Sequence, residues 1–162
     1  MKKFITVCCV NYLCIICFAQ WITYPLPIPN VDVNAIAIDA QGNKWCATWK
    51  GVAKFNGSSW TSFDTSNSNL ASNVVNSVAV IGSEIWFATS KGVSIFNGIS
   101  WTTYNTANSG LINDDVTTIT ADKHGNKWLG TGNGISKFNG VNWVTYDTAL
   151  TGFPNRRSRQ WQ

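Results

Sequence analysis

The sequence is poor in charged and chemically reactive side chains. Of its 162 residues only 12% are charged, and it contains one histidine and one methionine. Four of the five cysteines lie within the first 17 residues, so Cys46 is the only one that follows. A lone cysteine excludes an intramolecular disulfide in that part of the chain. With 44% hydrophobic residues, the chain can still form a core and is not expected to be disordered.

The body of the chain also lacks a surplus of positive charge, although the formal net charge is +4. The surplus lies at the two ends, in Lys2, Lys3, Arg156, Arg157 and Arg159. Between Trp21 and Asn155, seven lysines are balanced by eight Asp and Glu residues. A nucleic-acid-binding domain would carry a basic face, so nucleic acid is not an expected partner.

Long hydrophobic runs are absent after residue 20. The one such run, residues 4–18, follows two lysines and precedes Ala19, which is the pattern of a secretory signal peptide. We therefore expect residues 1–19 to be removed before Gln20 and the mature protein to be periplasmic or extracellular, including the cell surface. The alternative is an N-terminal membrane anchor, but about fifteen residues interrupted by Asn11 are short for a bilayer crossing of about twenty.

What the chain does contain is a threefold repeat. The units begin with "VNAIAI" at Val33, "VNSVAV" at Val75 and "VTTITA" at Val116, which are 42 and 41 residues apart. Six tryptophans recur in register, at Trp45, Trp86 and Trp128 and at Trp60, Trp101 and Trp143. A fixed period of about 40 residues is typical of propeller blades.

Each unit divides into four short strands, which in the first unit are "VNAIAI", "KWCAT", "GVAKFN" and "WTSFD". The third and fourth strands are joined by "FNGSSW", "FNGISW" and "FNGVNW" in the three units, and Asn-Gly between strands predicts a hairpin. The sequence therefore predicts an all-β fold of three four-stranded antiparallel repeats of about 41 residues. We place these β-propeller-type blades at about residues 33–64, 75–105 and 116–147.

Metal-binding and catalytic patterns are lacking. Asp39 and Asp122 begin D-x-x-G-N turns, and a calcium site would need several more oxygen ligands, so we interpret both aspartates as turn residues. His124 lies in one of these turns with no nucleophile nearby. Cys46 aligns with core positions of the other repeats, which predicts a small buried residue. We expect no enzyme activity, no metal and no cofactor.

The repeated series of Asp39, Gly42, Trp45, Thr48, Gly51, Phe55, Gly57, Trp60 and Phe63 resembles the two-component regulator propeller repeat. That family's pattern runs D-x-x-G-x-x-W-x-G-T, then G-(L/V)-x-x-F-(D/N)-G, then W and Y. The resemblance covers essentially residues 21–155. It implies the exported sensor part of a hybrid two-component regulator, which often reads carbohydrates, or a secreted surface protein. The sequence contains no kinase or response-regulator segment, so this polypeptide is not expected to signal alone.

An isolated fourth strand precedes the first blade. "WITYP" at residues 21–25 matches "WTSFD", "WTTYN" and "WVTYD", and an outer strand of this kind could complete the last blade of a ring. A closed propeller needs about four to eight blades, and the repeat stops before a divergent tail at residues 156–162. We therefore expect residues 20–155 to be an incomplete propeller: a fragment, an interrupted gene product, or a subunit. Its partners would be further blades or other copies of itself.

A ligand is expected where the copies differ in loops. The turns between the second and third strands and one linker supply the candidate binding residues Trp49, Lys50, Lys91, Asn133, Asp114 and Asp115. An exposed tryptophan beside a lysine suits a carbohydrate, including an acidic glycan, or another small ligand. The alternative for Trp49 is that it shields the open side of the first blade. For the whole chain, the alternatives to a ligand-binding sensor module are a structural or adhesion segment and a truncated product without function.

Overall fold

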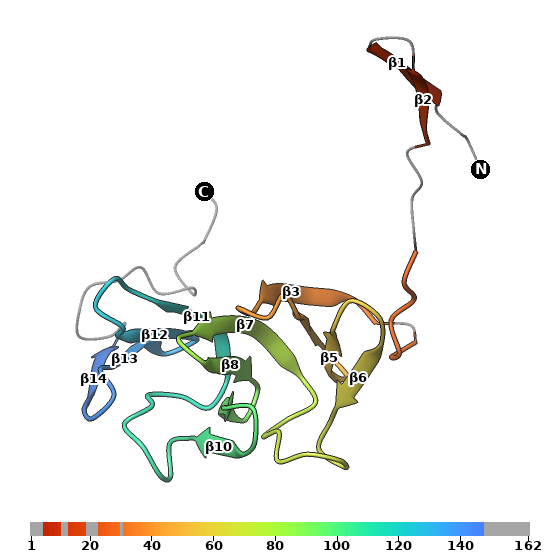
Figure 1. The fold of residues 1–162 in the computed structure, drawn as a ribbon. Helices are drawn as coiled ribbons and strands as arrows, with labels where there is room; N and C mark the ends of the chain where they lie inside the picture. The colour runs from red at the N-terminus through yellow and green to blue at the C-terminus, as the bar shows by residue number, and fades with distance from the viewer. Residues whose placement is uncertain (1–4, 11–12, 19–22, 30, 148–162) are drawn as a thin grey trace, which may run out of the picture.

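The computed structural model describes residues 5–10, 13–18, 23–29 and 31–147 (Figure 1). Twelve of its strands form three blades. Blade 1 contains β3 (Val33–Ile38), β4 (Lys44–Thr48), β5 (Gly51–Phe55) and β6 (Trp60–Phe63). Blade 2 contains β7 (Val75–Ile81), β8 (Glu84–Thr89), β9 (Gly92–Phe96) and β10 (Trp101–Tyr104). Blade 3 contains β11 (Val116–Ala121), β12 (Lys127–Thr131), β13 (Gly134–Phe138) and β14 (Trp143–Asp147).

Each blade is an antiparallel meander in which consecutive strands pair. The first strands of neighbouring blades contact each other, β3 with β7 and β7 with β11, while the fourth strands lie toward the outside (Figure 1). The three sheets do not close into a ring within the described residues. The predicted all-β, incomplete propeller is thus confirmed.

The predicted Asn-Gly hairpins are formed by the asparagine side chains. In blade 2, the Asn97 side-chain oxygen accepts hydrogen bonds from the backbone N–H groups of Ile99 and Ser100, at 2.9 and 2.8 Å. Gly98 follows with φ of 97°, a conformation that glycine adopts without steric cost. This turn recurs in each blade and sets the register between its third and fourth strands.

Each blade starts with a bulge, which in blades 1 and 2 provides a hydrogen bond to the next blade. The pairing register shifts between Val33 and Ala35, which leaves Asn34 out of the ladder. Its side-chain N–H donates to the Val75 carbonyl of blade 2 at 2.8 Å. Asn76 repeats this contact with Val116 of blade 3 at 2.8 Å. Bulges bend a strand and redirect a side chain, and here they join the inner strands of neighbouring blades.

The core lies between the blades, where the facing sides of neighbouring sheets are buried against each other. We call the side of a blade that carries Trp45, Trp86 or Trp128 its forward face, and the side that carries Cys46, Phe87 or Leu129 its rear face. Trp45, Ala47 and Val52 pack against Val78, Ile85 and Phe87 of blade 2. Trp86, Ala88 and Val93 pack in the same way against Ile119, Leu129 and Phe138 of blade 3.

Aromatic rings extend this packing toward the outer strands. At the first interface, Phe63 lies 5.9 Å from Phe96 and 5.7 Å from Trp101, measured between ring centroids. At the second interface, Tyr104 lies 5.5 Å from Phe138 and 5.6 Å from Trp143. Aromatic pairs at such distances add to the stability gained from area burial. Trp45, Trp86, Trp101 and Trp143 therefore pack blade against blade.

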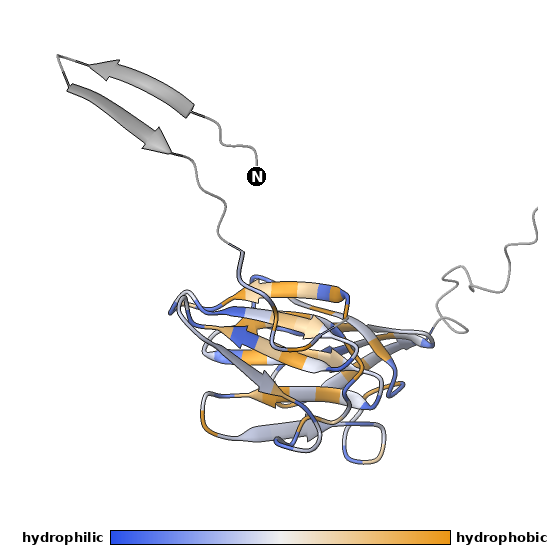
Figure 2. Cartoon of the chain, turned by 90° about the vertical axis from the view of Figure 1, so that its right-hand side faces the viewer, coloured by the Kyte–Doolittle hydropathy of each residue, from blue (hydrophilic) through white to orange (hydrophobic). Residues whose placement is uncertain are grey.

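The rear face of blade 1 has no neighbouring blade among the described residues. Ile36 and Ile38 are 62% and 61% exposed, whereas Val78 and Ile119, which occupy the position of Ile36 in the other blades, are 7% and 5% exposed. Figure 2 looks onto this side of the molecule, where hydrophobic stretches lie open on the uppermost strand. This face has the composition of a blade interface without a blade covering it.

The N-terminal approach to blade 1 differs from the expected outer strand at residues 21–25. Thr23, Tyr24 and Pro25 form no strand, because no third strand of a preceding blade is present to pair with them; residues 21 and 22 lie outside the described residues. Tyr24 nevertheless packs on Phe55, with ring centroids 4.7 Å apart. The equivalent outer-strand rings Phe63 and Tyr104 make the same contact with the next blade. Tyr24 thus occupies the place of a preceding blade's outer ring.

The N-terminal segment of the chain forms a separate hairpin of β1 (Ile5–Val10) and β2 (Leu13–Phe18). The expected cleavage site at residues 19–20 and the divergent tail at residues 156–162 lie outside the described residues. Removal of a signal peptide stays a prediction. In the part of the chain that the structure describes, no helix is long and apolar enough to cross a membrane.

The exposed rear face predicts self-association through blade 1. Replacing Ile36 by Lys is expected to reduce association while changing the free energy of unfolding by less than about 0.5 kcal/mol, since this side chain is largely exposed. Sedimentation velocity over a range of concentrations measures the first effect and thermal melting the second.

The matched control is Val78→Lys, which places the same charge at the equivalent buried position of blade 2. We expect a loss of several kcal/mol or failure to fold, because an unpaired charge would enter the interface. Equal association of wild type and Ile36→Lys would show that this face is not the contact.

Candidate functional site

Two regions of the blades can be considered as sites: the rim predicted from the sequence and a groove on the opposite rim. In blades 1 and 3, a carboxylate holds the turn between the first and second strands. The Asp39 oxygens accept hydrogen bonds from the N–H groups of Gln41 and Asn43, from the Asn43 side chain at 2.7 Å, and from the Trp45 indole at 2.9 Å. The predicted turn role of Asp39 is therefore what the structure shows.

The same arrangement recurs in blade 3 with Asp122, which accepts from Asn126 at 2.7 Å and from the Trp128 indole at 3.0 Å. In blade 2 the aspartate is missing, and Glu84 accepts from the Trp86 indole at 3.0 Å instead. Each forward-face tryptophan thus has a carboxylate partner, and two different sequence positions supply it.

These hydrogen bonds govern the protonation of the two aspartates. Partial burial raises the pKa of Asp39, but the hydrogen bonds from Asn43 and Trp45 outweigh it and hold the pKa below its ordinary value. For Asp122, hydrogen bonds from Asn126 and Trp128 hold the pKa well below its usual range. Both carboxylates are therefore ionised at neutral pH and serve as fixed acceptors.

The reactive side chains give no catalytic arrangement. Cys46 is a buried core residue, as predicted, and burial raises the pKa of its thiol, so the thiolate needed for nucleophilic attack is disfavoured. The backbone N–H of His124 donates to Asp122 within the turn. Within residues 23–29 and 31–147, no three His, Cys, Asp or Glu side chains gather as metal ligands.

The predicted rim carries the turns between second and third strands. Trp49 is 58% exposed, and Lys50, exposed beside it, donates to the Pro29 carbonyl at 3.4 Å. In blade 2, Lys91 precedes Gly92, whose N–H donates to the Asp114 carbonyl at 2.6 Å. The structure thus places Lys91 next to the linker that contains Asp114.

The remaining predicted residues have local hydrogen bonds. The Asp114 carboxylate accepts from the Thr106 N–H at 2.7 Å, so its side chain braces the linker. The backbone N–H of Asp115 donates to the Asn113 side chain at 2.7 Å, and that of Asn133 donates to Thr131 at 3.2 Å. Trp49 and Lys50 lie exposed beside each other at this rim.

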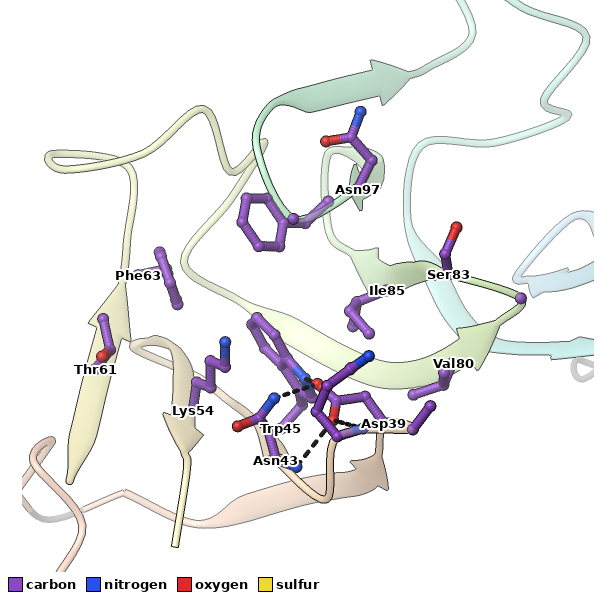
Figure 3. A pocket seen from close by; sticks show the side chains of 15 residues that line it. Asp39, Asn43, Trp45, Lys54, Thr61, Phe63, Val80, Ser83, Ile85 and Asn97 are labelled. Atoms are coloured by element: carbon purple, nitrogen blue, oxygen red, sulfur yellow. Dashed lines mark hydrogen bonds between the residues drawn. The ribbon is translucent and has the colours of Figure 1, made fainter. Parts of the chain in front are cut away.

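On the opposite rim, a groove of about 640 Å³ lies between blades 1 and 2 (Figure 3). Lys54, Thr61 and Phe63 line it from blade 1, and Val80, Ile85 and Phe96 from blade 2. Asp39 and Asn43 form part of its floor beside Trp45. None of the residues predicted as ligand-binding lines it.

Sequence reasoning missed this groove because it combines positions from two repeats. One signal was available: the segment before the recurrent tryptophan of the second strand is one residue shorter in the middle repeat, "IGSEI" against "DAQGNK" and "DKHGNK". In the structure, Gly82 and Ser83 alone join Ile81 to Glu84. This short turn borders the groove.

In a comparison with solved structures, the chain is similar to the extracellular domains of two bacterial signalling systems. It is 27% identical to the extracellular domain of the hybrid two-component system BT3049 from B. thetaiotaomicron, with a TM-score of 0.64, covering 73% of this chain and 18% of that chain. The resemblance to the two-component regulator propeller repeat is confirmed. The extracellular domain of the one-component system BT4673 from the same organism has a TM-score of 0.65 at 21% identity, covering 80% and 18%.

Enzymes share this fold as well. Virginiamycin B lyase from Staphylococcus aureus has a TM-score of 0.61 at 14% identity, covering 75% of this chain and 43% of that chain; this likeness concerns the fold alone. No protein-family model matches the sequence, and no curated protein matches it. The chain spans about a fifth of the length of the two extracellular sensor domains, at 18% each.

The carboxylate partners predict an acid-sensitive fold. Because the pKa of Asp39 and of Asp122 is lowered in the folded state, their contribution to stability is present above the ordinary carboxyl pKa of about 4 and is lost as pH falls below it. Melting temperatures should therefore fall as the pH drops below about 5 and should continue to fall below pH 3, because the loss is complete only at the lowered pKa values of the folded state.

The variant Asp122→Asn should lower the melting temperature at pH 7, since a neutral amide replaces an acceptor of four hydrogen bonds, and should flatten the acid dependence. Ser83→Asn, in the turn of blade 2 without such an aspartate, is the control with unchanged pH dependence. A variant Asp122→Asn as acid-sensitive as wild type would contradict this assignment.

Proposed function

We propose that this chain is part of an exported, non-enzymatic sensor propeller that binds a small extracellular ligand. The observation that carries the proposal is the likeness, at 27% identity and a TM-score of 0.64, to the extracellular domain of a hybrid two-component system. Export is further supported by the leader-like residues 1–19. The chain would supply blades and a binding surface, and signalling output would require other segments.

A carbohydrate is the ligand that we propose for the rim of Trp49. An exposed indole offers the flat apolar surface on which a sugar ring can stack, and Lys50 beside it offers a hydrogen-bond donor and a positive charge. Blades 2 and 3 have Ser90 and Gly132 at the position of Trp49. Such variation in a loop on a repeated scaffold favours recognition.

A structural or adhesion role is the second candidate, because one observation favours it. The exposed Ile36 and Ile38 form an apolar surface that suits association with further blades or with another copy. In that case Trp49 would protect the edge of blade 1, and its removal would affect stability.

Replacing Trp49 by Ala distinguishes these two functions. For the sensor, we expect binding to a glycan panel that includes uronic acids to weaken by at least about tenfold, as for other central aromatic contacts. The free energy of unfolding should change by no more than about 0.5 kcal/mol, which is the usual range for a surface substitution.

The control is Ile99→Ala, which removes another exposed apolar side chain, 93% exposed, from the opposite rim. It should leave glycan binding unchanged. Absence of binding to any glycan by the wild type, together with a destabilised Trp49→Ala, would favour the structural role.

A further inference from the structure

The groove between blades 1 and 2 combines a cation with an apolar wall. Lys54 extends from β5 with its ammonium 4.9 Å from the centre of the Trp45 ring. Among the residues that line the groove, it is the only cationic side chain. Figure 3 shows Lys54 and Phe63 on the blade 1 side, facing Val80 and Ile85 of blade 2.

The only carboxylate in the lining, that of Asp39, has its acceptor sites occupied within its own turn. A carboxylate offers about four acceptor sites, and Asp39 already accepts from two backbone N–H groups, from Asn43 and from the Trp45 indole. Its oxygens are committed to the turn. The Lys54 ammonium therefore keeps donor capacity for a group that enters from solvent.

The walls suit a flat apolar body. Phe63 and Phe96 lie with ring centroids 5.9 Å apart on opposite blades, and both are half-buried. Val80 and Ile85 continue this surface toward the short turn at Gly82 and Ser83. The exposed side chains of Gln41, Thr61 and Asn97 stand at the mouth and can donate or accept hydrogen bonds.

We propose that this groove binds a small organic carboxylate with a flat apolar face, its charged group against the Lys54 ammonium and its body against the apolar surface of Phe63, Val80 and Ile85. A volume of about 640 Å³ lies within the range of about 300–1,000 Å³ that small-molecule sites occupy. This site is separate from the Trp49 rim and goes beyond the proposed carbohydrate binding.

The repeat supplies a matched comparison. Blade 2 has Ile95 at the position of Lys54, and the lysine over its Trp86 ring is Lys127 of blade 3, 5.5 Å from the ring centre. Blade 3 has Lys137 at the same position, with its ammonium 5.2 Å from the centre of the Trp128 ring. Lys137 thus reproduces the lysine–tryptophan pair of Lys54 without lining the groove.

Titration of the full chain with benzoate, followed by amide NMR, tests the proposal. We expect saturable shifts confined to the groove, including Gln41, Ser83 and Asn97, with a Kd on the order of millimolar for a ligand of this size. Benzyl alcohol, which keeps the ring but lacks the charge, should bind about fivefold or more weakly.

The variant Lys54→Gln should weaken benzoate binding by the same factor, whereas Lys137→Gln should leave it unchanged. If Lys54→Gln alters the fold, the comparison of benzoate with benzyl alcohol on the wild-type protein still measures how binding depends on the charge of the ligand. Shifts outside the groove, equal binding of benzoate and benzyl alcohol, or an equal effect of the two lysine variants would overturn the proposal. Trp49→Ala should not change benzoate binding, which separates this result from the test of the rim.

Discussion

The fold depends on a buried tryptophan whose indole N–H is bound by a carboxylate. An unpaired indole N–H at a blade interface would cost free energy on burial, so a nearby acceptor stabilises the packed ring. Asp39 and Asp122 supply that acceptor from a turn of their own blade. The tryptophan thereby helps to hold the turn that supplies its acceptor. Glu84 in blade 2 shows that the acceptor is required while its position is not.

The two ends of the array differ in chemistry. The rear face of blade 1 presents Ile36 and Ile38, which match the residues that close the internal interfaces. The forward face of blade 3 carries Thr118 and Thr120 where blade 1 has Ala35 and Ala37, and both threonines are exposed. Lys137 adds a charge to the same face. The rear face of blade 1 is thus the more apolar of the two exposed faces. Tyr24 covers only the outer part of this face, where it packs on Phe55.

Much of the fold could be predicted because each repeat contains the residues that determine its own strands and turns. The Asn-Gly pairs, the alternating strands and the in-register tryptophans act over fewer than ten residues, and three copies reinforce one another. The exchange of Asp for Glu84 was not predictable from the repeat, since the two residues occupy different positions and only geometry shows that they bind equivalent indoles.

The groove escaped prediction for a related reason. It depends on a one-residue shortening in blade 2 beside Lys54 of blade 1, and pairing these requires knowing which faces meet. The rim of Trp49, by contrast, was predicted from a single out-of-register tryptophan, and the structure places that residue at the surface.

The asparagine hydrogen bonds couple neighbouring blades to each other. Asn34 and Asn76 each link a blade to the following one, whereas Thr117 of blade 3 donates to Gly130 of its own blade at 3.0 Å. In a linear array, stability is a sum of unit terms and nearest-neighbour terms. Blade 2 has neighbours on both sides and holds two such bridges, while the outer blades hold one each. Local unfolding should therefore start in blades 1 and 3, and blade 2 should unfold last.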